Sequence, residues 1–257
     1  MSEALPPENP SEDDMPTIVT LEQVLDVLTN GEMETTHGLL RYSSNHTFLV
    51  TMRQDDLCIP AVYKPRRGER PLWDFPDGTL CNRERAAFLT SDLLDWDIVP
   101  PTSLRDGSHG IGSVQFYVDH DPAINYFSFD ERFAPQLARL ALFDALVNNA
   151  DRKGGHCLLD GEGQVWGIDH GITFNAEHKL RTVIWDFAGQ SVPQQLMEDV
   201  RRLCEALEDD TSIYYTQMAE LLNRSELAAF QQRVNKLLRT SIYPRPGPGP
   251  NYPWPAV

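Results

Sequence analysis

The sequence predicts an α+β protein of two lobes, a small β-rich lobe followed by a larger, mostly helical one. Strand-like runs with turn residues between them fill most of the first 120 positions. From residue 133 onward, apolar residues recur with the 3.6-residue period of helices. The chain has 257 residues, 41% of them hydrophobic, which is enough for two lobes with a packed core. A cleft between such lobes is a common place for a binding site.

The first lobe is predicted to begin with a helix over residues 20–29. Thr20 can cap it, and Gln23 follows three residues later as in a capping box. Strands are expected at 38–42, 47–53 and 58–64, then a helix at 82–94 and a strand at 114–118.

The second lobe is predicted from a strong apolar stripe after Phe133. Two short strands are expected on either side of the turn at 160–163. Helices are predicted at 194–208, 213–222 and 226–239. We interpret these stripes as core. The predicted boundaries are a mobile acidic tail at 1–16, a nucleotide-binding lobe at 17–120, a catalytic lobe at 121–242 and a proline-rich tail at 243–257.

The proline-rich tail cannot form a helix or a central strand, because its prolines lack the N–H donor. It is either a loose end or a segment that packs on the body through Tyr252 and Trp254.

The formal charge of −16 argues against a general nucleic-acid binder, which would carry a basic face. Nucleotide binding remains possible, since a local basic cluster and a divalent metal can neutralise phosphates. Four widely separated cysteines indicate reduced thiols, and no apolar run reaches the length of a membrane span. These features predict a cytoplasmic protein.

The strongest chemical signal is the glycine-rich run from Asp151 to His156, followed by Asp169. Asp151 follows a helix and is the candidate to accept a hydroxyl proton or to orient a nucleophile. Lys153 could offset charge on a transferring phosphoryl group. Asp169 ends a short strand and suits Mg²⁺, which prefers one or two carboxylates plus phosphate oxygens. Either His156 or Asn149 could be a second metal ligand or an orienting group.

The first lobe adds a candidate phosphate site. Lys64 ends a strand beside Arg66, Arg67 and Arg70, the one dense basic patch of the chain. Glu84, on the next helix, could hold the Lys64 ammonium in place. The turn Ser43-Ser44-Asn45 could point backbone N–H groups at an anion, although such a turn is usually an ordinary hairpin.

Together these residues, and the stretch from Ala61 to Glu84, resemble the protein-kinase-like superfamily. The resemblance is to its atypical branch of phosphatidylinositol 3-/4-kinases and HipA-type kinases, and especially to related bacterial proteins. It implies a two-lobed protein-kinase-like fold and covers most of residues 35–240.

The resemblance also implies roles for individual residues. Asp151 would be the catalytic-loop aspartate with Lys153 beside it, and Asp169 the metal-binding aspartate. The ATP-binding residues would be Ser43, Ser44 and Asn45 in the phosphate loop, the Lys64–Glu84 pair, and a hinge formed by Gln115, Phe116, Tyr117 and Val118. His156 stands where the family usually has a metal-binding asparagine, and Asp-His-Gly replaces Asp-Phe-Gly at residues 169–171.

The predicted activity is ATP-dependent transfer of the γ-phosphoryl group to a hydroxyl, on a protein serine or threonine, a small polyol or a lipid head group. ATP with Mg²⁺ or Mn²⁺ is the expected cofactor set, and imidazole favours the softer Mn²⁺. The alternative is a nucleotide-binding pseudokinase or regulatory module without transfer.

Overall fold

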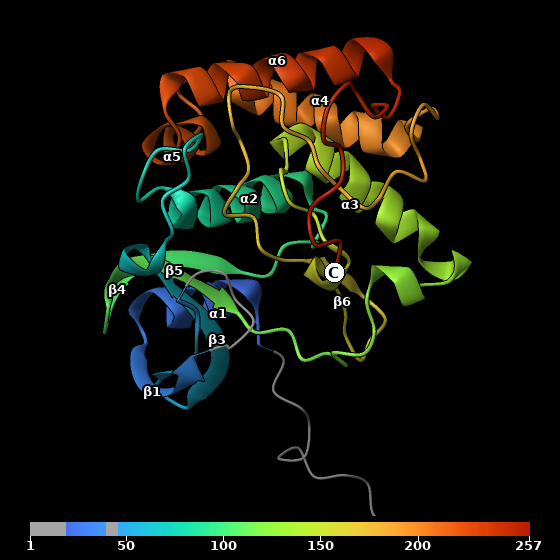
Figure 1. Cartoon of the computed structure of the whole chain (residues 1–257). Helices are drawn as coiled ribbons and strands as arrows, with labels where there is room; N and C mark the ends of the chain where they lie inside the picture. The colour runs from blue at the N-terminus through green and yellow to red at the C-terminus, as the bar shows by residue number, and fades with distance from the viewer. Residues whose placement is uncertain (1–18, 40–45) are drawn as a thin grey trace, which may run out of the picture.

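The computed structural model describes residues 19–39 and 46–257. The predicted acidic tail at 1–16 and the turn formed by Ser43, Ser44 and Asn45 lie outside the described residues. The elements form two lobes. In the view of Figure 1 the sheet and helix α1 (Leu21–Asn30) lie in the lower part, and a layer of helices lies above them. This confirms the predicted α+β fold class.

The first lobe is a five-stranded antiparallel sheet with the order β1-β2-β3-β5-β4. Its strands are β1 (Glu32–Leu39), β2 (Phe48–Gln54), β3 (Leu57–Pro65), β4 (Thr102–Gly107) and β5 (Gly110–Phe116). The first strand begins earlier than the expected 38–42. The sequence prediction missed β4, because its polar composition does not show the apolar alternation of a half-buried strand.

Helix α1 (Leu21–Asn30) begins as predicted, with a complete capping box between Thr20 and Gln23. Its buried Val27 and Leu28 pack with residues of the sheet, including Val50 and Met52, to form the small core of this lobe.

The second lobe contains α3 (Ala134–Val147), a hairpin of β6 (Cys157–Leu159) and β7 (Val165–Gly167), and three further helices. These are α4 (Gln194–Glu208), α5 (Ile213–Leu221) and α6 (Arg224–Thr240). Short 3₁₀ turns lie at Arg66–Gly68, Tyr126–Ser128, Glu131–Phe133 and Gly154–His156. The predicted helices and hairpin of this lobe are therefore present, with ends that shift by a few residues.

Helix α2 (Leu80–Leu94) belongs to both lobes. It lies between β3 and β4 in sequence and packs beside β4 and β5, yet its buried Ala86, Ala87 and Phe88 are part of the large core of the second lobe. The helix is buried on most sides, so its orientation fixes how the two lobes meet.

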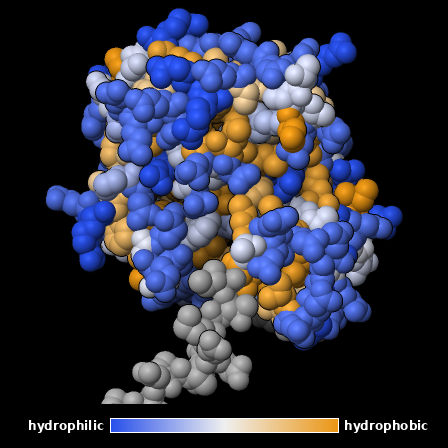
Figure 2. Space-filling model, turned by 180° about the vertical axis from the view of Figure 1, so that it is seen from behind, coloured by the Kyte–Doolittle hydropathy of each residue, from blue (hydrophilic) through white to orange (hydrophobic). Residues whose placement is uncertain are grey.

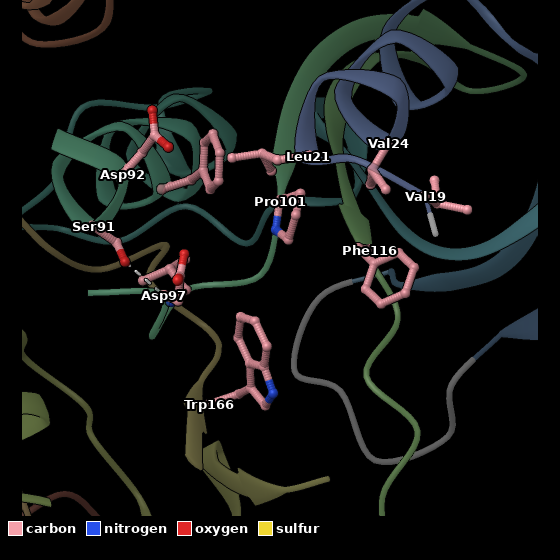
Figure 3. A pocket seen from close by; sticks show the side chains of 11 residues that line it. Val19, Leu21, Val24, Ser91, Asp92, Asp97, Pro101, Phe116 and Trp166 are labelled. Carbon is pink, nitrogen blue, oxygen red and sulfur yellow. Dashed lines mark hydrogen bonds between the residues drawn. The ribbon is translucent and has the colours of Figure 1, made fainter. Parts of the chain in front are cut away.

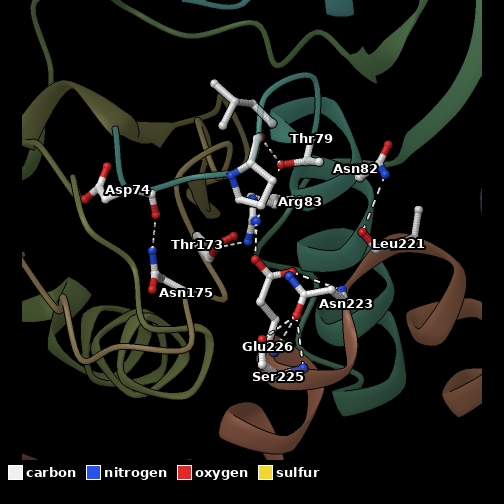
Figure 4. A network of polar contacts seen from close by, with 12 residues as sticks. Asp74, Thr79, Asn82, Arg83, Thr173, Asn175, Leu221, Asn223, Ser225 and Glu226 are labelled. Atoms are coloured by element: carbon white, nitrogen blue, oxygen red, sulfur yellow. Dashed lines mark hydrogen bonds and ion pairs between the residues drawn. The ribbon is translucent and has the colours of Figure 1, made fainter. Parts of the chain in front are cut away.

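A buried ion pair locks α2 to α6. The Arg83 guanidinium donates to the Glu226 carboxylate at 2.5 Å and to the Thr173 carbonyl at 2.7 Å, and Arg83 is 1% exposed. Glu226 also completes the capping box that starts α6 at Asn223. Figure 4 shows this network joining three segments that lie far apart in the sequence.

The surface seen from behind is mostly hydrophilic, with hydrophobic residues gathered along a central strip (Figure 2). Within the described part of the chain, no helix is long and apolar enough to cross a membrane.

Glu226→Gln is expected to lower the free energy of unfolding by about 3 kcal/mol, because it leaves the Arg83 charge buried without a counter-ion. Urea denaturation measures the change. The control is Glu220→Gln on exposed surface of α5, for which a change within about 0.5 kcal/mol is expected. Equal effects of the two substitutions would contradict a structural role for the pair.

Candidate active site

Lys64 points from β3 toward the second lobe. Alternate residues Ala61 and Tyr63 are buried in the small core, so Val62 and Lys64 lie on the opposite face of the strand. The Lys64 ammonium contacts the Glu84 carboxylate at 2.5 Å and the Asp169 carboxylate at 3.0 Å. The structure thus brings together three of the predicted site residues, from β3, α2 and the segment after β7.

Glu84 makes two contacts with its carboxylate. Oε1 contacts Lys64, and Oε2 accepts a hydrogen bond of 2.9 Å from the backbone N–H of His170. Burial lowers the pKa of Lys64, but the charges of Asp169 and Glu84 outweigh it and leave that pKa above its ordinary value. Lys64 is therefore a fixed cation at neutral pH.

Asp169 adopts a left-handed backbone conformation with φ of 61°, which is uncommon for a residue other than glycine. Such strain is often found where a side chain must be aimed. Lys64 holds the pKa of Asp169 well below its usual range, against the effect of burial. The carboxylate is thus an anion held next to the ammonium of Lys64.

Asp151 and Lys153 face each other in the loop after α3, with Nζ of Lys153 3.4 Å from Oδ2 of Asp151. Burial raises the pKa of Asp151 to about 6, and Lys153 and Asp169 act on it in opposite directions. A carboxylate with a raised pKa is a better proton acceptor than an ordinary one.

His156 lies between the two acidic residues. Its Nδ1 is 3.0 Å from the Asp151 carbonyl oxygen and 3.4 Å from the backbone nitrogen of Lys153. Burial lowers the pKa of His156 to about 4, although the nearby Asp169 opposes this. The ring is therefore neutral at pH 7, and its Nε2 lies 3.4 Å from Oδ2 of Asp169.

His156 Nε2 and Asp169 Oδ2, 3.4 Å apart, are atoms of the kind that bind divalent metals. The pair His156 Nε2 and Asp169 Oδ2 fits a divalent metal whose remaining ligands come from phosphate or water. Neither here nor at any other place in the described residues is a group of three His, Cys, Asp or Glu side chains placed to hold a metal ion. The donor set is thus a partial one, as expected for a metal that arrives with a nucleotide.

Asn149, the other candidate ligand, is used inside the protein. Its Nδ2 donates to Asp144 and its Oδ1 accepts from the Asp151 N–H, both at 2.9 Å, and the residue is fully buried. The geometry brings His156 rather than Asn149 to Asp169.

The sequence analysis did not identify Arg152, which connects the loop at 151–156 to the segment at 168–170. Arg152 is fully buried and donates to both oxygens of Asp144 at 3.0 to 3.1 Å. Its guanidinium also donates to the carbonyls of His156 and Ile168 and to the ring of His170. The signal was available, because Asp144 is a charged residue on an otherwise apolar helix stripe.

The residues of the predicted hinge, 115–118, differ in whether their hydrogen-bond donors are available to a ligand. Gln115 is buried and donates to Thr102, while the backbone N–H groups of Phe116 and Tyr117 bond to the carbonyls of Pro101 and Pro60. The N–H of Val118 has no hydrogen-bond partner among the residues that the structure describes. It is the backbone donor of this stretch that remains for a ligand.

A hollow of about 250 Å³ is lined in part by Phe116 of the predicted hinge and contains none of the residues that contact Lys64. Figure 3 shows Phe116 and Trp166 on one side of it and residues of α1 and α2 on the others.

The proline-rich tail crosses the second lobe and ends at the loop that contains Gly154 (Figure 1). The Asn251 carbonyl accepts from the Thr182 N–H and the Trp185 indole, each at 3.1 Å, and the Ala256 carbonyl accepts from the Gly154 N–H at 2.8 Å. The expected anchors were wrong, because Tyr252 and Trp254 are 58% and 92% exposed. Backbone carbonyls and the buried Tyr243 and Pro253 hold the tail instead.

The fold and this arrangement of charges define a kinase-like protein. A family model described as phosphatidylinositol 3- and 4-kinase matches residues 101–232, which include Asp151, His156 and Asp169. Protein Rv2133c of Mycobacterium tuberculosis is 38% identical over 265 residues, covering 90% of this chain and 94% of that protein. The chain belongs to the phosphatidylinositol 3- and 4-kinase family, within the protein-kinase-like superfamily that the sequence resembles.

A solved structure shares the fold. The crystal structure of the Helicobacter pylori proinflammatory kinase CtkA matches with a TM-score of 0.50 and 12% identity, over 84% of this chain and 94% of that one. At this identity the similarity establishes the architecture alone. It confirms the predicted two-lobed kinase-like fold.

Deleting residues 249–257 is expected to speed hydrogen exchange at the Gly154 and Thr182 amides by about fivefold, because each loses an acceptor carbonyl. The Val183 amide, which bonds to the Arg152 carbonyl, is expected to change less. Amide exchange followed by NMR measures this, with Trp254→Ala as the control that keeps all of these bonds. Unchanged protection at both amides would show that the tail does not support the loop.

Proposed function

We propose that the chain transfers the γ-phosphoryl group of ATP to the hydroxyl of an acceptor, with a divalent metal bound at Asp169 and His156. The observation that supports this proposal most strongly is that the carboxylates of Glu84 and Asp169 both contact the Lys64 ammonium, with Asp151 nearby. Phosphoryl transfer needs mainly positioning and charge neutralisation, and these residues supply both.

Lys64 is proposed to bind nucleotide phosphate, and Glu84 to hold its ammonium in place for that purpose. In the hinge from Gln115 to Val118, the free Val118 N–H is proposed as the donor to the adenine. The predicted phosphate turn of Ser43, Ser44 and Asn45 stays part of this proposal on sequence grounds. We keep the predicted lobe boundaries, with 17–120 binding nucleotide and 121–242 carrying the catalytic loop.

Asp151 is proposed to accept the proton of the acceptor hydroxyl as its oxygen attacks the γ-phosphorus. The bond from that phosphorus to the bridging oxygen then breaks, and ADP leaves with the electron pair. Lys153 is proposed to offset the negative charge on the transferring group. A bound Mg²⁺ or Mn²⁺ would neutralise phosphate charge, while Lys64 and the Arg152 scaffold keep Asp169 in position.

Asp151→Asn is expected to lower turnover by about a hundredfold or more while nucleotide affinity changes little, because the amide cannot accept the proton. ADP release and phosphate incorporation into lysate fractions measure turnover, and a thermal shift with ATP and metal measures binding. Glu162→Gln, in the exposed β6–β7 turn, is the matched control. Full turnover in Asp151→Asn would refute its role. Nucleotide binding by the wild type without turnover would support the non-transferring module instead.

Mn²⁺ is expected to support tighter nucleotide binding and faster turnover than Mg²⁺, because a neutral imidazole is a softer ligand than an amide oxygen. His156→Asn is expected to reduce this preference. Titration of ATP in each metal, with wild type and variant, measures it. Identical behaviour of the two ions in both proteins would remove His156 from the metal site.

A further inference from the structure

A hollow of about 490 Å³ lies in the second lobe, between the end of α3, the segment 178–180, α6 and the start of the proline-rich tail. We call it the basic pocket, for its four cationic or titratable side chains His178, Arg233, Lys236 and Arg245. None of the residues assigned to the reaction lines it. Its volume falls in the range of small-molecule sites, roughly 300–1,000 Å³.

The charge of the basic pocket is opposite to that of the chain. The protein carries a net charge of −16, yet no aspartate or glutamate lines this hollow. Lys236 and Arg245 make no ion pair and no side-chain hydrogen bond with any described residue. Cations concentrated in one hollow of an acidic protein favour an anionic occupant.

Arg233 provides the strongest sign of a missing partner. Its Nε and Nη1 donate to the carbonyls of Leu146 and Asn175, at 2.9 and 3.1 Å. Its Nη2 is buried and has no partner among the described residues, and the Phe230 ring, 5.9 Å away, offers only a weak cation–π contact. The Arg233 guanidinium thus has no carboxylate partner among the described residues, and a cation without a counter-ion favours an anion nearby.

The rest of the lining is apolar. Leu146, Leu180, Leu237 and Tyr243 supply hydrophobic walls, and Ile242 is a large hydrophobic residue left 46% exposed. Inorganic phosphate alone would not cover these walls, whereas a molecule with an apolar body would. The lining thus combines an apolar surface with a cluster of cations.

We propose that the basic pocket binds a small amphiphile with an apolar body and one anionic head group, either a carboxylate or a phosphate monoester. The head group pairs with Lys236 and Arg245, close to the positive charge of Arg233, and the apolar body lies against the leucines and Tyr243. This site is separate from the one around Lys64 and Asp169 and does not depend on the proposed reaction.

The test uses the full chain and four probes that share a ten-carbon chain, each below its critical micelle concentration. These are decanoate, decyl phosphate, decanol and decyltrimethylammonium, with inorganic phosphate as a fifth ligand. Isothermal titration is expected to show the two anionic amphiphiles binding about tenfold or more tightly than decanol, since charge-assisted contacts are the strong ones. The cationic probe and inorganic phosphate are expected to bind more weakly still. The ratio of decanoate to decyl phosphate affinity identifies the head group.

Variants tie the binding to the pocket. The double substitution Lys236→Gln with Arg245→Gln is expected to weaken decanoate binding by about tenfold. Ala145→Phe, which fills the hollow and keeps every charge, is expected to remove binding. Arg239→Gln, on the same helix but outside the lining, is the matched control and is expected to bind like the wild type. Asp151→Asn is also expected to bind decanoate normally, so failure of the phosphotransfer proposal would leave this one standing.

The proposal is overturned if no amphiphile binds, if decanol or the cationic probe binds as tightly as decanoate, or if inorganic phosphate binds as tightly as decyl phosphate. It is also overturned if Arg239→Gln weakens binding as much as the double variant does.

Discussion

The carboxylate of Glu84 is the point on which the site depends. One oxygen contacts the Lys64 ammonium from the sheet, and the other accepts from the His170 amide, next to Asp169. A single side chain of α2 therefore fixes both the cation and the anion of the site. Because Glu84 is only 2% exposed, water competes poorly for either contact.

Two buried arginines hold the surroundings of Glu84. Arg83, its neighbour on α2, is paired with Glu226, and Arg152 is paired with Asp144 inside the second lobe. Arg83 also bonds to Thr173, and Arg152 to Ile168, so the segment that carries Asp169 is gripped on both sides. Buried ion pairs contribute little net stability, but they penalise any other arrangement of the same chain. Their role here is to keep the two lobes in a single relative orientation.

The sequence was sufficient for the order of the elements apart from β4, and for the choice of three site residues that the structure brings together. Lys64, Glu84 and Asp169 could be named because a fixed chemistry requires those residue types in that order. The pairing of Asp144 with Arg152 was not predicted, since periodicity says where a residue faces and not what it pairs with there. The free N–H of Val118 and the contact between Gly154 and Ala256 depend on backbone geometry across distant segments, which no local pattern encodes.

The contact between Gly154 and Ala256 also bears on how the protein is made. A chain leaves the ribosome from its N-terminus, and its domains generally fold in that order. The loop that contains Gly154 therefore waits for an acceptor carbonyl that lies far downstream in the chain, after the last helix of the second lobe. Both lobes can collapse while this loop still lacks that partner, so nascent chains would gain their shape before the loop is held in place.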